Sequence, residues 1–354
     1  MNESSCTQSQ LSAPFSSGYR MPAEWEKHDS VWLSWPYDTN TFKNIDKVEQ
    51  TYVEIITAIH TAEKINLLVL DETMKNRSIA CLEKKRVDMS QVIFHLYDYA
   101  DVWFRDYGPV FLVNRRSGKL SIVNWTFNAW GGKYDELLKD DSIPVMINRK
   151  LKLPLYSPDI VLEGGSIDVN GEGVLLTTKQ CLLNKNRNSG LSLQEIESYL
   201  RQYLGAEKVI WLEGGIAGDD TDGHVDDVAR FVNHNTVLAA WEEDENDANF
   251  DILRKNYKIL SNSFTIKGEP LRVKKIPMPK KADSGEENLP ASYVNFYIGN
   301  NVVLVPVFGQ KSDKSALEII SGFFPEKSVE GIDCCDLVRG FGAIHCITQQ
   351  QPSL

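Results

Sequence analysis

Residues 340–352, GFGAIHCITQQQP, place one cysteine between small residues and a polar run near the end of the chain. If this stretch is extended, Ile344, Cys346 and Thr348 share one face of a strand. The preceding glycines let a backbone or a ligand approach closely. An isolated cysteine is more often a small, buried and inert residue. Acidic and histidine-containing segments far upstream favour the alternative, in which the thiol is presented to partners.

Glycines recur along the chain at a nearly constant spacing. Gly108, Gly165 and Gly223 are separated by about 58 residues, and Gly342 lies about two such periods further. Between them, short hydrophobic strands, a turn and a helical segment follow one another. Repeats of this length are typical of one supersecondary unit arranged several times around an axis. The sequence therefore predicts an α/β ring of hairpin–helix–strand units whose glycine turns meet at one end.

Composition excludes several classes of protein. The chain of 354 residues is 42% hydrophobic and 25% charged, which is ordinary for a globular protein. Its net charge of −11 argues against nucleic acid or an anionic membrane surface as partner and favours a small cationic substrate. The six cysteines form no CxxC pair, so we expect reduced thiols.

The N-terminal sequence and the lengths of the apolar runs indicate the location of the protein and its division into domains. The N-terminus has neither the basic nor the apolar region of a secretion signal, and no apolar run approaches the ~18 residues of a membrane span. We therefore expect a cytoplasmic protein. Residues 1–18, rich in Ser and Gln, predict a disordered tail, and residues 19–354 a single catalytic domain. The oligomeric state stays open, with a homodimer as one alternative.

Four polar loci stand at the predicted turns. Asp106 follows a run of aromatic residues, Glu163 precedes two glycines, and His224 and Asp226 are two residues apart, so that they face the same way on an extended segment. If the turns converge, these groups surround Cys346. Two carboxylates suit a planar guanidinium, a thiolate attacks its carbon, and an imidazole oriented by a third carboxylate moves the protons.

Each locus also has a simpler reading. Asp106 could form a structural ion pair with Arg105, and Glu163 could accept hydrogen bonds from backbone N–H groups of its turn. The acidic residues 219–227 could be a solvated loop or a Ca²⁺ site, although they lack the EF-hand pattern. No second histidine or cysteine stands at zinc-ligand spacing from His224, so no metal site is predicted.

Taken together, the motifs resemble those of the agmatine deiminase family. This family belongs to the guanidino-group modifying superfamily, which also holds bacterial-type peptidyl-arginine deiminases. The matching segments span nearly the whole chain: MPAEWEKHDSVWLSWP, WFRDYGPVF, LEGGSIDVNGEGVLL, DDTDGHVDDVARFV, ASYVNFYIGN, VLVPVFG and GAIHCITQQQP. The resemblance implies a five-bladed, pseudo-symmetric α/β propeller (pentein) of ββαβ modules with a central active site. It also implies hydrolysis of agmatine to N-carbamoylputrescine and ammonia, a step of putrescine and polyamine biosynthesis, without a metal or organic cofactor.

The resemblance assigns roles to the catalytic residues. Cys346 matches the nucleophile, which carries a covalent S-alkylthiouronium, and His224 matches the general acid and base. Asp106 and Asp226 match the pair that binds the guanidinium. Glu163 matches the acid that orients the histidine.

Three further residues resemble substrate contacts. Trp103 matches a wall of the substrate channel, Asn295 a position near the nucleophile, and Asp220 is our choice for the distal amine of agmatine. Asp168 departs from the family, where His often stands, and this puts substrate detail in doubt. The alternatives are a peptidyl-arginine deiminase, an amidinotransferase, an inactive relative and, outside enzymes, a Ca²⁺-binding interaction module.

Overall fold

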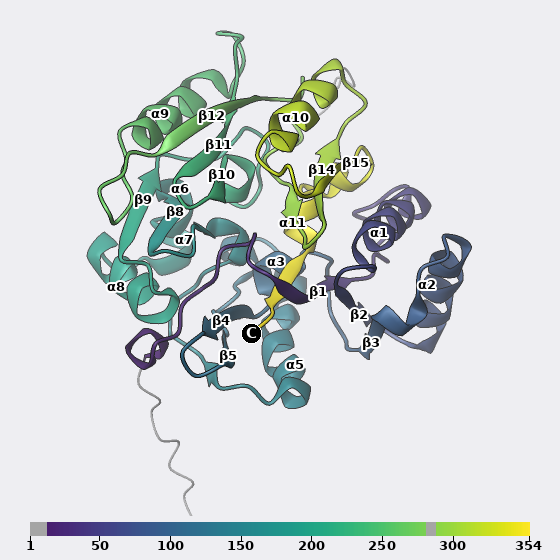
Figure 1. Ribbon diagram of the computed structural model, residues 1–354. Coiled ribbons are helices and arrows are strands. Elements are labelled where there is room, and N and C mark those ends of the chain that lie inside the picture. Colours follow the sequence, from purple (N-terminus) through teal and green to yellow (C-terminus); the bar gives the residue numbers. More distant parts are fainter. Residues whose placement is uncertain (1–12, 281–287) are drawn as a thin grey trace, which may run out of the picture.

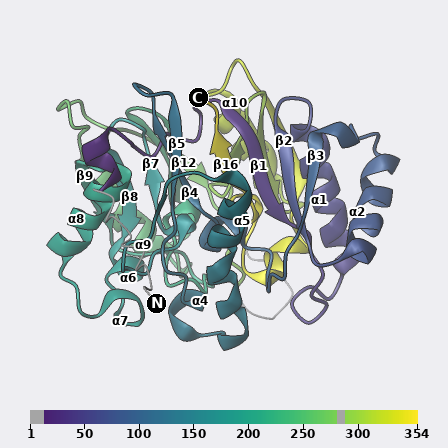
Figure 2. The same cartoon turned by 90° about the horizontal axis from the view of Figure 1, so that it is seen from below.

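Strand β16 (Gln349–Pro352), which ends the cysteine stretch, pairs antiparallel with β1 (His28–Ser34) near the start of the chain. The computed structural model describes residues 13–280 and 288–354. Strand β1 continues in parallel to β2 (Lys64–Val69) and then to β3 (Val92–Leu96), so the two ends of the chain complete one sheet (Figure 2).

Four more sheets repeat the same pattern of an antiparallel hairpin, a helical connection and a parallel third strand. They are β4 (Val110–Asn114), β5 (Lys119–Val123) and β6 (Leu155–Tyr156); β7 (Asp168–Val169), β8 (Val174–Thr178) and β9 (Lys208–Leu212); β10 (Ala229–Asn233), β11 (Thr236–Trp241) and β12 (Arg272–Pro277); and β13 (Tyr297–Ile298), β14 (Val302–Val307) and β15 (Ser328–Asp333). The five sheets surround a common centre (Figure 1). The predicted five-bladed α/β propeller of ββαβ modules is confirmed.

The longer helices lie on the outside of the ring (Figures 1 and 2). They are α1 (Ile45–Ile59), α2 (Glu72–Lys84), α5 (Ile143–Leu151), α8 (Leu193–Leu204), α9 (Phe250–Ser261) and α10 (Lys311–Ser321). Helix α8 shows how the sequence sets its bounds. Ser192 and Glu195 form a capping box at its start, and Gly205 ends it in the left-handed conformation (φ 75°). The shorter helices are η1 (Pro14–Ser17), η2 (Met89–Gln91), α4 (Ala129–Gly132), η3 (Asp135–Ser142), α6 (Lys179–Leu182), α7 (Lys185–Asn188) and η6 (Leu337–Gly340).

A short turn of chain precedes the first strand of every blade. These turns are α3 (Phe104–Tyr107) before β4, η4 (Gly164–Ser166) before β7, η5 (Val225–Asp227) before β10, residues 292–295 before β13, and α11 (Ile344–Ile347) before β16. Turn α3 contacts both α11 and η4, and η4 contacts η5. The turns therefore meet around the axis of the ring, as the glycine spacing predicts.

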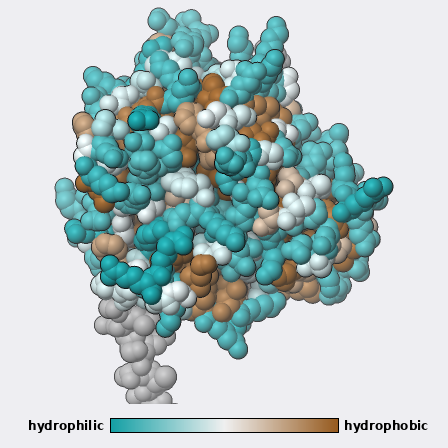
Figure 3. Space-filling model, viewed as in Figure 1, coloured by the Kyte–Doolittle hydropathy of each residue, from teal (hydrophilic) through white to brown (hydrophobic). Residues whose placement is uncertain are grey.

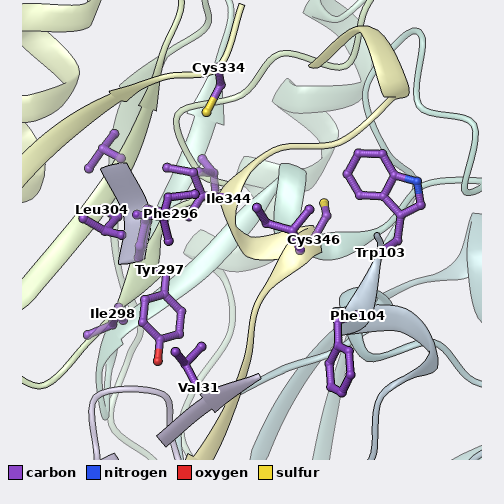
Figure 4. Packing of buried hydrophobic residues seen from close by; sticks show 14 of the residues in the cluster. Val31, Trp103, Phe104, Phe296, Tyr297, Ile298, Leu304, Cys334, Ile344 and Cys346 are labelled. Atoms are coloured by element: carbon purple, nitrogen blue, oxygen red, sulfur yellow. The ribbon is translucent and has the colours of Figure 1, made fainter. Parts of the chain in front are cut away.

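The strand predicted around Cys346 is wrong. Residues 344–347 form one helical turn, and the strand begins only at Gln349. Because residues two apart in a helix point about 200° apart, Ile344 and Cys346 face opposite ways. Figure 4 shows Ile344 on the side of Phe296 and Cys346 on the side of Trp103. A single turn is too short to show a hydrophobic period, which is why the pattern did not reveal it.

The same correction applies to two other predicted extended segments. The aromatic run before Asp106, whose residue types predict a strand within residues 101–109, instead contains the helical turn α3 before Gly108. His224 is extended (φ −59°, ψ 140°), but Asp226 lies inside the 3₁₀ turn η5, so their spacing does not put them on one strand face. Both nevertheless approach the same point, as described below.

The structure describes residues 13–18 of the predicted N-terminal tail. Residues 1–12 of the predicted disordered tail lie outside the described residues, whereas η1 (Pro14–Ser17) is helical and Phe15 packs against Gly205. The single domain over residues 19–354 stays a prediction. No helix of the described part is long and apolar enough to cross a bilayer. The face seen in Figure 3 is mainly hydrophilic, with hydrophobic residues in scattered patches.

Candidate active site

Cys346 lies on turn α11 against the side chains of two neighbouring blades. Its Sγ accepts a hydrogen bond from Asn295 Nδ2 (3.1 Å) and its thiol points at Asp226 Oδ2 (3.8 Å). The Asn295 amide is held in this orientation because its Oδ1 accepts from the backbone N–H of His345 (2.9 Å). Burial, reinforced by Asp226 and Asp227, raises the pKa of the Cys346 thiol well above its ordinary value. This environment favours the thiol over the thiolate when no cation is bound.

Gly165 marks the point where reactive groups of two other blades converge. A Cβ at this position would lie 2.6 Å from His224 Nδ1, 2.7 Å from Asp106 Oδ1 and 3.2 Å from Asp226 Oδ2. The backbone N–H of Gly165 also donates to Asp106 Oδ1 (3.0 Å). Only a residue without a side chain leaves room for this convergence, which brings together three of the predicted site residues.

Asp106 is held between blades rather than paired with its neighbour in sequence. Its Oδ2 accepts from Trp130 Nε1 (2.9 Å), and its Oδ1 is 3.6 Å from His224 Nδ1. Arg105 instead donates to Gln350 Oε1 (2.8 Å) and lies 3.5 Å from Glu24 Oε2. The alternative of a structural Arg105–Asp106 ion pair is therefore not what the structure shows.

The electrostatics of this pair follow from burial and mutual charge. Burial raises the pKa of Asp106 to about 6, against the lowering effect of His224. Burial alone would lower the pKa of His224, but Asp106 and Glu163 outweigh it and raise that pKa. His224 is thus favoured as an imidazolium, able to donate a proton.

Glu163 occupies a buried pocket on the far side of His224. Its Oε1 accepts from Arg187 Nε (2.6 Å), and the Cys181 thiol points at its Oε2 (4.0 Å). Donor atoms of Glu163, Cys181 and His224 lie within 4.8 Å of one another, but no hydrogen bond joins Glu163 to His224 in the described structure. The carboxylate close to Nδ1 is Asp106. The orienting role of Glu163 therefore stays a prediction, now one that acts through charge.

A cavity of about 700 Å³ opens beside these residues. Cys346, Asp106, Trp103 and Trp130 line it, whereas His224, Asp226 and Asn295 are buried behind this wall. Trp103 packs flat on the backbone upstream of the cysteine: a Cβ at Gly342 would lie 2.4 Å from its ring. The small residues before Cys346 therefore make room for Trp103, which stands beside the cysteine in Figure 4.

Asp220 lines the same cavity, as the assignment to the distal amine requires. Its Oδ2 accepts a hydrogen bond from the hydroxyl of Tyr134, and its Oδ1 is 3.5 Å from Lys133 Nζ. Lys133 partly offsets its charge, so the role of Asp220 stays a prediction. Asp168, the departure from the family pattern, does not line this cavity. It is buried against Arg230, with Nε to Oδ1 at 2.8 Å.

Carboxylates of the acidic loop, residues 219–227, already accept hydrogen bonds from other groups of the protein. Asp219 accepts from Thr221 N (2.7 Å) and His224 N (2.9 Å), and Asp222 accepts from Arg187 Nη1 (2.9 Å). These bonds shape the approach to His224 and occupy the carboxylates of Asp219 and Asp222, which argues against a Ca²⁺ site on the exposed part of the loop.

Among the described residues, two groups have donor atoms close enough for a metal, within 4.8 Å of one another. One is Glu163, Cys181 and His224; the other is Asp226, Asp227 and Cys346. We identify neither as a metal site, because Arg187 already supplies a cation to the first and the second contains the sulfur expected to react.

Three buried side-chain atoms of the cluster have no hydrogen-bond partner among the described residues. They are His224 Nε2, Asp226 Oδ1 and Asp227 Oδ1. Unpaired polar atoms are rare in protein interiors, and two of these are carboxylate oxygens that require donors. The cluster therefore has unfilled capacity for a ligand rich in N–H groups.

Sequence reasoning missed several neighbours of the reactive groups: Trp130, His345, Asp227, Cys181 and Arg187. For Trp130 a signal existed, since an aromatic residue before two glycines suggests an unusual turn. Trp130 adopts the left-handed conformation (φ 52°, ψ 46°), which is strained for a bulky residue and delivers its N–H to Asp106. Cys181 and Arg187 lie in the helices of one blade and carried no local signal.

Comparison with known proteins gives a consistent result. Residues 20–352 match the family described as Porphyromonas-type peptidyl-arginine deiminase. The agmatine deiminase of Medicago truncatula is 37% identical over 371 residues, covering 95% of this chain and 97% of that protein. The solved agmatine deiminase of Enterococcus faecalis superposes with a TM-score of 0.89 at 35% identity, covering 97% and 98% of the chains. The agmatine deiminase from C. jejuni gives 0.82 at 32% identity, with 94% and 96% covered.

Proposed function

This chain belongs to the Porphyromonas-type peptidyl-arginine deiminase family, and we infer that it is an agmatine deiminase, a hydrolase of guanidino groups. It converts agmatine and water into N-carbamoylputrescine and ammonia. The observation that carries this assignment is the convergence of Cys346, Asp106, Asp226 and His224 beside one cavity. These groups match a flat cation whose central carbon is attacked by sulfur.

The guanidinium is held by carboxylates. Asp106 lines the cavity and Asp226 lies one layer deeper with its Oδ1 unpaired, so the two accept N–H donors from different edges of the planar group. A guanidinium between them offsets the negative charge that raises the pKa of the Cys346 thiol. Substrate binding therefore favours release of the thiol proton to solvent, and the N–H of Asn295 stabilises the resulting thiolate.

The first half of the reaction is displacement of ammonia. The Cys346 thiolate forms a C–S bond to the guanidinium carbon, and a tetrahedral adduct results. His224, favoured as an imidazolium, donates a proton to one –NH₂ group. The C–N bond to that group breaks, ammonia leaves, and an S-alkylthiouronium remains on Cys346.

The second half is hydrolysis. His224, now neutral, takes a proton from water as the water oxygen attacks the same carbon. The C–S bond of the new tetrahedral species then breaks, and its hydroxyl proton passes to the departing Cys346 sulfur. The ureido product leaves, and the Cys346 thiol and the His224 imidazolium are restored.

Agmatine suits the cavity better than arginine does. Acidic side chains outnumber basic ones in its lining: Asp38, Asp101, Asp106, Glu136 and Asp220 against Lys43, Lys139 and Arg339. Such a lining attracts the distal ammonium of agmatine and repels the carboxylate of free arginine. Asp220 is our choice for the ammonium contact.

Peptidyl-arginine is the second candidate, favoured by the description of the matched family. Ammonia release from agmatine, free arginine and a peptide containing arginine separates the two. We expect turnover of agmatine to exceed that of both others by more than tenfold. Preferred turnover of the peptide would overturn the assignment of substrate, and transfer of the amidino group to an added amine without free ammonia would indicate an amidinotransferase instead.

We also propose that the enzyme works in the cytoplasm. All five cysteines in the described part of the chain are free, including the nucleophile, and a reducing compartment keeps them so. A homodimer is the oligomeric state to test, by light scattering of the purified protein.

A further inference from the structure

The histidine next to the nucleophile has a role that the reaction above does not use. His345 is buried and does not line the large cavity, so it does not reach the substrate. Its Nδ1 is 2.7 Å from Asp226 Oδ2, and its Nε2 is 2.8 Å from Glu24 Oε2. Each ring nitrogen therefore faces a carboxylate oxygen at hydrogen-bond distance.

This geometry fixes the state of the ring. Ionised carboxylates only accept hydrogen bonds, so a ring nitrogen that bonds to one must carry a proton. Burial alone would raise the pKa of Glu24, but Arg230 and His345 hold it well below its ordinary value. Burial likewise opposes ionisation of Asp226, yet the hydrogen bond and charge of His345 lower its pKa. Both partners are thus carboxylates.

The charges packed around His345 also favour a ring that is protonated on both nitrogens. Arg105 donates through Nε to the His345 carbonyl (3.2 Å), and Arg230 donates to Glu24 Oε2 (2.9 Å). Arg230 also pairs with Asp168 at 2.8 Å. Two guanidinium groups thus face three carboxylates, and the buried cluster is neutral when His345 is protonated. The other polar neighbours, Asn295 and Gln350, are uncharged amides.

We propose that His345 is a positioning residue, a buried imidazolium that fixes Asp226 so that its free Oδ1 accepts the guanidinium of the substrate. Because Asp226 Oδ2 is taken by His345, the other oxygen is left unpaired. The His345 backbone N–H bonds to the amide of Asn295, whose N–H in turn reaches the sulfur. His345 therefore positions both Asp226, which binds the guanidinium, and Asn295, which donates to the sulfur of the nucleophile. This inference rests on the proposed function.

The test compares His345→Gln with His28→Gln. His28 is a matched control, because it is equally buried and bonded to Glu63 (3.2 Å) and Tyr297 (3.1 Å), outside the site. Glutamine keeps one hydrogen bond but not the charge. We expect His345→Gln to lower kcat/KM for agmatine by about tenfold or more, mainly through KM, because Asp226 loses a charge-assisted partner. The control should keep kcat/KM within about twofold of the wild type.

The pH profile separates positioning from a merely structural role. In His345→Gln the acid limb of kcat/KM should move to higher pH, since Asp226 no longer has the cation that lowers its pKa. If the wild-type enzyme deiminates agmatine but His345→Gln shows an unmoved acid limb and an unchanged KM, the positioning role is overturned and the proposed function is not. A wild-type enzyme without deiminase activity overturns the proposed function. If His345→Gln does not fold, Glu24→Gln addresses the same contact from the other side and should shift the same limb.

Discussion

Replacing Gly165 with alanine places one methyl group where catalytic groups of two other blades converge. The added Cβ would lie 2.6 Å from His224 Nδ1 and 2.7 Å from Asp106 Oδ1, whereas ordinary contacts are about 3.4–4 Å. His224 and Asp106 must therefore move apart by roughly 1 Å, and a misplacement of this size costs about 100-fold in rate. Gly165 has no positive φ, so the effect is one of space and not of backbone strain.

The assay is ammonia release from agmatine, with thermal unfolding measured in parallel. We expect kcat/KM of Gly165→Ala to fall about 100-fold, while overpacking lowers the free energy of unfolding by about 1–3 kcal/mol. Gly190→Ala is the matched control, since a Cβ there meets nothing within 4 Å and its φ is not positive. A folded Gly165→Ala enzyme with kcat/KM within threefold of the wild type would refute the convergence of these groups.

The remaining predictions concern single contacts and pH. Asn295→Ala removes the N–H donor at 3.1 Å from the sulfur, and kcat should fall about 10²-fold, as for the loss of other preorganised donors; a pre-steady-state burst of normal rate would contradict this. Trp130→Phe keeps the ring but loses the bond to Asp106, so KM for agmatine should rise by about fivefold to tenfold in steady-state assays, and an unchanged KM would leave the indole N–H without a role. As the pH falls through about 6, Asp106 takes up a proton and no longer attracts the guanidinium, so kcat/KM should decline there in a pH profile. A flat profile down to pH 5 would exclude Asp106 from binding the guanidinium.

The sequence predicted the ring from a weak repeat of glycines combined with the resemblance of its motifs. Gly108, Gly165 and Gly223 recur at nearly one period, next to the turns that carry Asp106, Glu163 and His224. The start of helix α8 was also predicted, from its cap Ser192. The one-turn helices were not predictable by periodicity, since a period needs more than four residues to appear. Cys346 was therefore assigned to a strand, although its closeness to the acids was expected correctly.

Contacts between residues far apart in the sequence were out of reach of local patterns. Nothing near His345 in the sequence indicates Glu24, which precedes it by more than 300 residues and becomes its neighbour only when β16 pairs with β1. Arg187 in α7 likewise reaches Glu163, which lies 24 residues earlier in the sequence. Long-range pairing of buried charges is set by the closure of the ring, and the residues that hold the site in place are those that sequence reasoning missed.

During the reaction Cys346 carries the substrate carbon as a covalent intermediate. Acid quenching within the first turnover, followed by mass spectrometry of the peptides, tests this directly. We expect the peptide containing Cys346 to gain the mass of agmatine less that of ammonia, in step with the first equivalent of ammonia released. An adduct on another side chain, or ammonia released at the wild-type rate by Cys346→Ser, would contradict the account.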